Sequence, residues 1–113
     1  MLIDVAPEVL MTGLGSPHRP LVIDVRRPEA FRAEPMIIPG AIWRDPHALA
    51  DWSRALPGGR ALVVYCVHGH EVSHDARDRL RRLGFDADLL VGGLEGWKAA
   101  GGEVVAAAQG DRP

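Results

Sequence analysis

Two short, strongly apolar runs at residues 21–25 and 61–65 restrict the possible folds of this chain more than any other feature. Both runs are rich in β-branched residues, and neither alternates with polar residues. This pattern is typical of strands that are buried on both faces of a parallel sheet. Parallel strands must be joined by crossover connections, which are usually helices. We therefore predict an α/β fold: a mostly parallel sheet of about five strands with helices on both faces.

The remaining elements follow from local patterns. Further strands are expected at residues 2–5, 41–43 and 88–91, and helices at residues 7–14, 28–32, 46–56, 72–83 and 94–100. Asp45 is a suitable N-cap for the helix at 46–56. A chain of 113 residues suffices for one hydrophobic core but not for two. We therefore expect a single domain over residues 1–113, with its core at about 20–101 and a loose tail at about 102–113.

Tryptophans and arginines of this chain are expected in different environments. Trp43 and Trp97 are expected to pack in the core or at its rim. Three arginines lie along the polar side of the expected helix at 72–83, namely Arg77, Arg81 and Arg82. We expect them on a solvated face, which could also serve as a docking surface for an acidic partner.

Composition excludes several classes of function. The formal net charge of −2 and the isoelectric point near 6.2 provide no electrostatic attraction for nucleic acid. No apolar run reaches the roughly 18 residues of a membrane span. The first residues lack the basic and apolar regions of a signal peptide, and a single cysteine cannot form an internal disulfide. We therefore expect a cytoplasmic protein that binds neither nucleic acid nor membranes.

The single cysteine, Cys66, directly follows the apolar run at 61–65 and precedes a short loop and the expected helix at 72–83. A thiol at this place faces the positive end of the helix dipole and the backbone N–H groups of the loop. Both features lower the pKa of a cysteine and make it a nucleophile. Cys66 is therefore the strongest candidate for a catalytic residue.

Four stretches, in the same order along the chain, resemble the rhodanese-like (single-domain sulfurtransferase) family. They are residues 23–31 (IDVRRPEAF), 37–42 (IIPGAI), 66–71 (CVHGHE) and 92–101 (GGLEGWKAAG). They are similar to the family's D-V-R-x-P-x-[EA]-[FY] segment, its H-I-P-G-A segment, its six-residue active-site loop and its closing G-G-x-x-x-W-x-x-A-G helix. Ile37 stands where the family usually has histidine.

The resemblance implies a sulfurtransferase without metal or other cofactor. Cys66 would take the outer sulfur of thiosulfate or of a low-molecular-weight persulfide, carry it as a persulfide, and pass it to a thiol, to cyanide or to a protein acceptor. Asp24 and Arg26 would support the active-site loop, and Arg26 could also reach a donor anion. The loop that would bind the donor comprises Val67, His68, Gly69, His70, Glu71 and Val72.

Glu71 departs from the family pattern, because many members carry arginine at this sixth loop position. A carboxylate there would repel both a thiolate and a dianionic donor, so we expect thiosulfate to be a poorer donor. Alternatively, Glu71 is a favourable residue at a helix N-terminus. His68 and His70 could contact the donor or line the rim of the pocket. Ser73 could be a pocket hydroxyl or an ordinary helix residue.

Three other interpretations compete with sulfur transfer. A phosphatase or arsenate reductase of the Cys-x5-Arg type needs an arginine at position 72 to bind the oxyanion, and this chain has Val72 there. A non-catalytic regulatory or docking module is the main alternative, because Glu71 replaces the loop arginine. A metal site is disfavoured, because alternate residues of one tight loop rarely converge on an ion. Its ligands would be Cys66, His68, His70 and His74.

Overall fold

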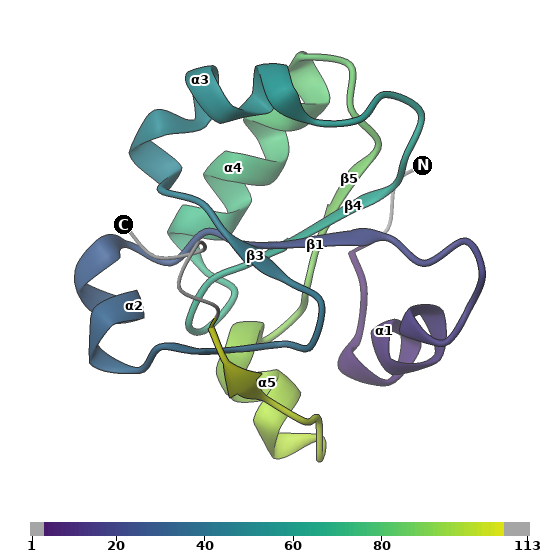
Figure 1. Cartoon of the computed structure of the whole chain (residues 1–113), viewed down its shortest axis with the longest axis vertical. Coiled ribbons are helices and arrows are strands. Elements are labelled where there is room, and N and C mark those ends of the chain that lie inside the picture. Colours follow the sequence, from purple (N-terminus) through teal and green to yellow (C-terminus); the bar gives the residue numbers. More distant parts are fainter. Residues whose placement is uncertain (1–3, 108–113) are drawn as a thin grey trace.

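A four-stranded parallel sheet in the order β3–β1–β4–β5 forms the centre of the molecule (Figure 1). The computed structural model describes residues 4–107. The strands are β1 (Leu21–Asp24), β3 (Ile42–Trp43), β4 (Leu62–Tyr65) and β5 (Ala87–Leu89). β1 and β4 pair over their whole length, from Leu21 opposite Leu62 to Asp24 opposite Tyr65. Both apolar runs are therefore confirmed as the central strands, where burial on both faces explains the lack of polar alternation.

The strand expected at residues 2–5 is only partly described, because residues 1–3 lie outside the described part of the chain. Val5 forms a single parallel bridge with Leu90, beyond β5. Its N–H donates to the carbonyl of Leu89 at 2.8 Å, and its carbonyl accepts from the N–H of Val91 at 2.8 Å. The sheet therefore has four strands, with one bridged residue at the fifth position that the sequence predicted.

Helices cover both faces of the sheet, as predicted (Figure 1). On one face α1 (Pro7–Leu14), α2 (Pro28–Ala33) and α5 (Gly93–Ala99) contribute Leu10, Phe31, Leu94 and Trp97 to a core with Val22 and Val63. On the other face α3 (Leu49–Trp52) and α4 (Glu71–Arg82) contribute Leu49, Ala76 and Leu80 to a core with Ile23 and Val64. Neighbouring residues of β1 and β4 thus point into opposite cores. Trp43 and Trp97 are buried, as expected.

The helix expected at residues 46–56 is wrong as a single element. The segment consists of two 3-10 turns, η1 (Pro46–Ala48) and η2 (Ser53–Ala55), on either side of the short helix α3. The expected cap is confirmed, because the side chain of Asp45 accepts a hydrogen bond from the N–H of His47. The indole of Trp52 donates to the carbonyl of Asp45 at 2.8 Å. This contact ties the end of α3 back to the residue that caps η1.

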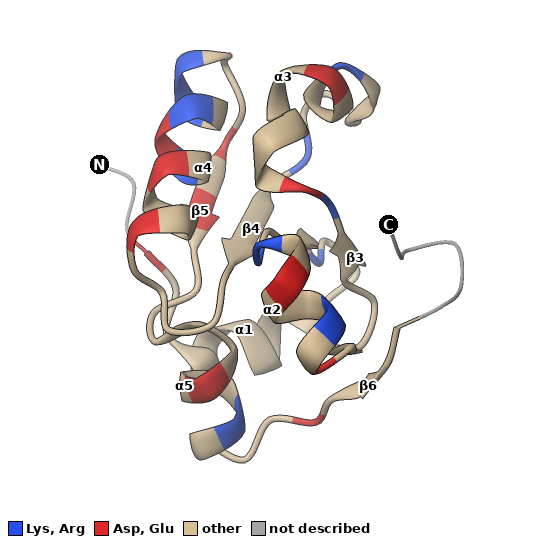
Figure 2. Ribbon diagram, turned by 90° about the vertical axis from the view of Figure 1, so that its left-hand side faces the viewer, with Lys and Arg blue, Asp and Glu red and all other residues tan. Residues whose placement is uncertain are grey.

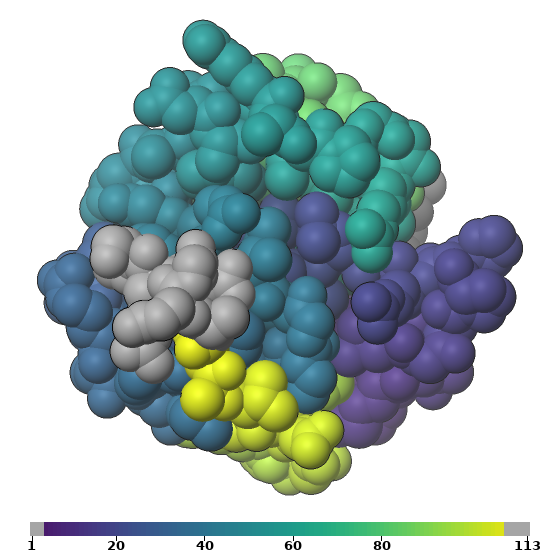
Figure 3. All heavy atoms as spheres, in the orientation of Figure 1, coloured from purple at the N-terminus to yellow at the C-terminus, as the bar shows by residue number. Residues whose placement is uncertain are grey.

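The first part of the tail that we expected to be loose forms a strand. β6 (Val105–Ala106) pairs antiparallel with β2 (Met36–Ile37), and the yellow part of the chain lies against the body of the molecule in Figure 3. The N–H of Ala107 also donates to the carbonyl of Pro35 at 2.9 Å. Neither β2 nor β6 was predicted, because each spans only two residues and neither lies in a stretch with a recognisable strand pattern. The rest of the expected tail, residues 108–113, lies outside the described residues.

The arginine face of α4 differs from the solvated surface that we expected. Arg77 forms an ion pair with Asp4, and the guanidinium of Arg81 contacts the carbonyl of Ala87 at 2.7 Å and the carboxylate of Asp88 at 3.0 Å. Figure 2 shows α4, with its charged residues coloured, beside β5. Arg77 and Arg81 therefore attach α4 to the N-terminal segment and to the edge of the sheet. Within residues 4–107, no helix is long and apolar enough to cross a membrane.

Candidate active site

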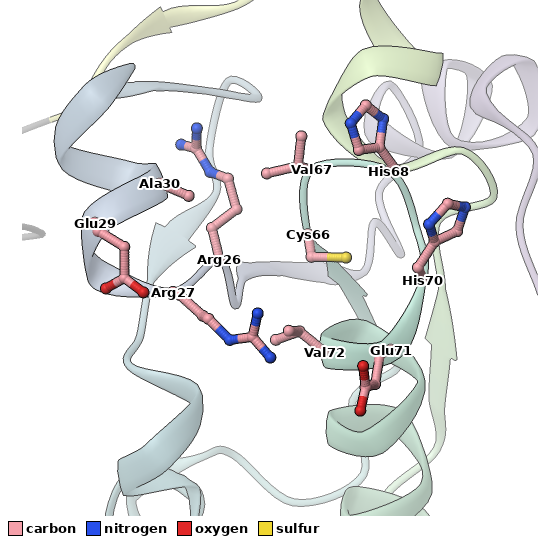
Figure 4. Close-up of a pocket in the computed structure, with 10 residues that line it drawn as sticks. All are labelled: Arg26, Arg27, Glu29, Ala30, Cys66, Val67, His68, His70, Glu71 and Val72. Atoms are coloured by element: carbon pink, nitrogen blue, oxygen red, sulfur yellow. The ribbon is translucent and has the colours of Figure 1, made fainter.

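Cys66 lies at the inner end of a surface cavity of about 350 Å³, at the carboxyl end of the central strand β4 (Figure 4). Its side chain is buried, with 6% of the residue exposed. The loop after β4 forms one wall of the cavity with Cys66, Val67, His68, His70, Glu71 and Val72. The turn after β1 and the start of α2 form the other wall with Arg26, Arg27, Glu29 and Ala30. The structure therefore brings the expected loop residues together around one cavity, except Gly69, which is buried behind it.

The loop is held in place by the beginning of α5. The N–H of Leu94 donates to the carbonyl of Cys66 at 2.8 Å, and the N–H of Glu95 donates to the carbonyl of Val67 at 3.0 Å. Gly69 has a φ of +73°, and a Cβ there would lie 2.9 Å from the backbone nitrogen of Gly92. Glycine is therefore required at position 69 both for its backbone conformation and for the close approach of the two segments. These contacts explain why two of the sequence stretches that are far apart in the chain, 66–71 and 92–101, act as one unit.

The sulfur of Cys66 has one side-chain partner. Its Sγ lies 3.1 Å from the Oγ of Ser73, which is fully buried in the first turn of α4. The hydroxyl of Ser73 in turn donates to the carbonyl of His70 at 3.3 Å. A hydroxyl can rotate to donate to a thiolate instead. Of the two roles that the sequence left open for Ser73, the structure therefore supports the hydroxyl that contacts the thiol.

A buried ion pair lies beneath the cavity. The guanidinium of Arg26 contacts the carboxylate of Asp24 at 2.7 Å and 2.9 Å, and both residues are at most 1% exposed. Nη1 of Arg26 donates to the carbonyl of Glu34, and Nη2, which also contacts Asp24, donates to the carbonyl of Met36, both at 2.9 Å. All three guanidinium nitrogens of Arg26 are therefore occupied by the protein. This arrangement agrees with the supporting role expected for the pair and leaves Arg26 poorly placed to bind a donor anion.

Tyr65 completes this buried layer. Its hydroxyl accepts a hydrogen bond from the N–H of Ile38 at 3.3 Å. Burial and the neighbouring Asp24 carboxylate raise the pKa of Tyr65 well above its ordinary value, so the phenol stays neutral. Burial also raises the pKa of Asp24, while the hydrogen bonds and the charge of Arg26 oppose that rise. The layer joins β1, β4 and the segment before β3 directly below the loop.

Arg27 is one of three cavity residues that the sequence interpretation missed, together with Glu29 and Ala30. It is exposed, and Figure 4 shows its guanidinium extending across the cavity toward Val72, whereas the guanidinium of Arg26 is turned away from Cys66. Alternation along the strand could not reveal this, because side chains on both faces of the sheet are buried, as Val25 is beside Asp24 and Arg26.

Glu71, His68 and His70 are all exposed at the loop. Glu71 is the first residue of α4, and in Figure 4 its carboxylate points away from the sulfur of Cys66. This direction weakens the repulsion that we expected from Glu71. The rings of His68 and His70 lie with their centroids 5.9 Å apart. Over residues 4–107, no three His, Cys, Asp or Glu side chains are close enough together to hold a metal ion.

Comparison with known proteins agrees with this geometry. The family model described as rhodanese-like domain matches residues 6–100. The thiosulfate sulfurtransferase GlpE of Pseudomonas syringae pv. syringae (strain B728a) is 37% identical over 79 residues, which is 69% of this chain and 72% of that protein. The GlpE of Pseudomonas savastanoi pv. phaseolicola (strain 1448A / Race 6) is 34% identical over 80 residues, or 70% of this chain and 73% of that protein.

Solved structures show the same fold. The Alr3790 protein from Anabaena sp. superimposes with a TM-score of 0.79 at 32% identity, over 91% of this chain and 80% of that one. The BH2092 protein from Bacillus halodurans superimposes with a TM-score of 0.80 at 26% identity, over 93% of this chain and 77% of that one. The fold of this chain is therefore shared with proteins of known structure.

Proposed function

This chain belongs to the rhodanese-like domain family, and we propose that it is a sulfurtransferase in which Cys66 carries the transferred sulfur. The observation that carries the proposal is the position of Cys66. It is the single cysteine of the chain, it ends the central strand at a cavity, and its sulfur contacts the hydroxyl of Ser73. The relatives named thiosulfate sulfurtransferase, at 34% and 37% identity, support the same activity.

The proposed first half-reaction transfers sulfur from the donor to Cys66. The thiolate of Cys66 attacks the outer sulfur of thiosulfate, an S–S bond to Cys66 forms, and the S–S bond of thiosulfate breaks. Sulfite leaves with the electron pair of that bond, and Cys66 remains as a persulfide. A low-molecular-weight persulfide would donate in the same way, with its thiolate as the leaving group. One cysteine suffices, because no disulfide within the chain forms at any step.

The second half-reaction passes the sulfur to an acceptor. A small thiol, cyanide or a thiol of another protein attacks the outer sulfur of the persulfide, and the Cys66 thiolate leaves. Cyanide gives thiocyanate, and a thiol gives a new persulfide. The cycle requires a free thiol and no cofactor, so we keep a reducing cytoplasm as the expected location. We also propose that residues 1–113 act as one rhodanese-like domain.

The loop from Val67 to Val72 is proposed to stabilise negative charge on the persulfide and on the leaving group. The carbonyls of Cys66 and Val67 accept hydrogen bonds from N–H groups of α5, so these two carbonyls are not directed at a bound anion. The anion would instead be bound by N–H groups of the loop and by the N-terminus of the twelve-residue helix α4. Such donors are most effective where charge develops during the reaction.

A non-catalytic docking module is the second candidate function. The observation in its favour is Glu71, an exposed carboxylate at the loop position where many family members carry arginine. This candidate predicts that Cys66 reacts with alkylating agents but takes no sulfur from any donor.

Intact-protein mass spectrometry under non-reducing conditions tests the proposal. The protein is incubated with thiosulfate and, separately, with a low-molecular-weight persulfide. We expect a mass increase of one sulfur atom that is absent from Cys66→Ser, and that is removed by cyanide with release of thiocyanate. If neither donor adds sulfur while Cys66 still reacts with iodoacetamide, the docking module is the better interpretation.

A further inference from the structure

We propose that Arg27 forms an oxyanion-binding subsite in the Cys66 cavity, and that this subsite selects sulfur donors with a sulfonate group next to the outer sulfur. The inference rests on the proposed function, because it concerns the donor of the same reaction. Thiosulfate is the simplest donor of this class. Organic thiosulfonates share the chemistry, since they also carry sulfonyl oxygens one bond away from the transferred sulfur.

The cavity contains two arginines, and only one of them is free to bind a ligand. Arg26 has protein partners at all three guanidinium nitrogens and is 1% exposed. Arg27 is exposed, lines the cavity, and forms no ion pair or side-chain hydrogen bond with any other residue in the range 4–107. An unpaired arginine that extends into a cavity beside a thiol is well suited to bind an anion there.

The backbone of Arg27 is held rigidly although its side chain is free. Arg27 is the N-cap of α2, and Pro28 follows it as the first residue of that helix. The carbonyl of Arg27 accepts a hydrogen bond from the N–H of Phe31 at 3.0 Å. On its other side, the buried side chain of Arg26 anchors the chain. The side chain of Arg27 therefore extends from a defined backbone position at the wall opposite the loop of Cys66.

The other charges of the cavity do not favour an anionic donor, so the positive charge of Arg27 strengthens its binding. The exposed carboxylates of Glu29 and Glu71 also line the cavity, whereas the charge of Arg26 is balanced by Asp24. Without Arg27, a dianion such as thiosulfate would meet only negative formal charges there when the histidines are neutral. The guanidinium can bind two sulfonate oxygens at once through its fork of N–H groups. The outer sulfur of the donor then remains free to face Cys66.

The apolar part of the cavity strengthens this attraction. Ala30, Val67 and Val72 line the space between the two walls. Apolar side chains displace water, so the attraction between Arg27 and an anion is screened less than on an open surface. The same side chains offer no hydrogen bond to the oxygens of the donor. Arg27 therefore supplies a side-chain contact that distinguishes a sulfonate donor from a persulfide, which has no sulfonyl oxygens.

Equilibrium binding tests the subsite without requiring turnover. Thiosulfate is titrated by calorimetry into the Cys66→Ser protein and into the double variant Cys66→Ser, Arg27→Gln. We expect the Kd to rise about tenfold in the double variant, which is the loss of one charge-assisted contact. Arg27→Lys should recover only part of this affinity, because lysine keeps the charge but lacks the fork. Equal affinity for thiosulfate in all three proteins would overturn the inference.

Arg32→Gln provides a matched control. Arg32 is an exposed arginine of the same helix that does not line the cavity, so its loss changes the net charge by the same amount. We expect it to leave the Kd for thiosulfate within twofold of the Cys66→Ser protein. An equal loss of affinity in the Arg32 and Arg27 variants would show a general charge effect and would also contradict the subsite.

Kinetics with two donors separate this inference from the proposed function. Arg27→Gln should raise the KM for thiosulfate about tenfold, and should change sulfur loading from 2-hydroxyethyl persulfide, a donor without sulfonate oxygens, by less than twofold. If Arg27→Gln loads sulfur on Cys66 normally and its KM for thiosulfate is unchanged, the subsite is contradicted but the proposed function is not. If Cys66 takes sulfur from neither donor, the proposed function fails, and the binding titration still decides whether Arg27 holds the anion.

Discussion

Arg26 and Arg27 are neighbours in the chain, yet they belong to two regions with opposite properties. Arg26 lies in the layer beneath the loop, where Asp24 and two backbone carbonyls bind its guanidinium. Arg27 lies in the cavity above, exposed and without a protein partner within residues 4–107. The same type of side chain thus stabilises the fold at position 26 and is available to a ligand at position 27.

This difference shows where binding capacity is located in the molecule. Throughout the described residues, every buried polar side-chain atom has a hydrogen-bond partner. Breaking the hydrogen bonds of these buried groups costs free energy, so the groups are not available to bind a substrate. In contrast, the cavity places Arg27, Glu29 and Glu71 at its walls as exposed charges. The buried layer therefore holds the loop in position, and the exposed charges determine what approaches Cys66.

The strongest test of the buried region is Arg26→Gln. This change leaves the carboxylate of Asp24 buried without its counter-charge, so we expect the free energy of unfolding to fall by about 3–5 kcal/mol. Urea denaturation measures this change. Arg27→Gln is the matched control, because an exposed side chain without partners should alter the free energy of unfolding by less than about 0.5 kcal/mol. Similar losses in the two variants would contradict the contrast between the two arginines.

An intermediate effect is expected where the two regions meet, at Gly69. In Gly69→Ala the new Cβ would lie 2.9 Å from the backbone of Gly92, in a backbone conformation that alanine disfavours. We expect a loss of about 1–3 kcal/mol in the free energy of unfolding, together with slower alkylation of Cys66 by iodoacetamide. Gly58→Ala is the control, since a Cβ at Gly58 meets nothing within 4 Å. A fully stable Gly69→Ala protein would show that the loop and α5 can separate without cost.

The smallest effect is expected in the open region, from Glu71→Arg. The carboxylate of Glu71 is exposed and points away from Cys66, so solvent and salt screen its charge. We expect the KM for thiosulfate to fall by no more than about threefold, and the difference to shrink as salt is added. Asp51→Arg changes the net charge equally at an exposed site on α3, outside the cavity, and should leave the KM unchanged. A tenfold improvement would instead restore Glu71 as the main barrier to anionic donors.

Local patterns predicted the elements that carry the site. The uninterrupted apolar runs at 21–25 and 61–65 correspond to β1 and β4, and the amphipathic run at 72–83 corresponds to α4. Hydrophobic burial and backbone conformation both act over a few residues, so a short stretch of sequence can reveal them.

Other features depend on partners far away in the chain. The pairing of β2 with β6 joins residues about seventy positions apart, and neither strand has a pattern of its own. The spacing of Arg77 and Arg81 is that of a solvated helix face. In the folded chain they instead form ion pairs with Asp4 and Asp88, which attach α4 to neighbouring segments. Charge and polarity describe a side chain but do not identify the group that it meets.

By itself, the sequence determined the α/β alternation and the position of Cys66 between a buried strand and a helix, because both follow from the order of apolar and polar residues. Only the tertiary structure decided which arginine of the pair at 26 and 27 is buried, and which charges face the cavity. The physical reason is that a charged side chain is buried only where counter-charges and carbonyls from other segments compensate its loss of hydration. Those partners come together when the chain folds.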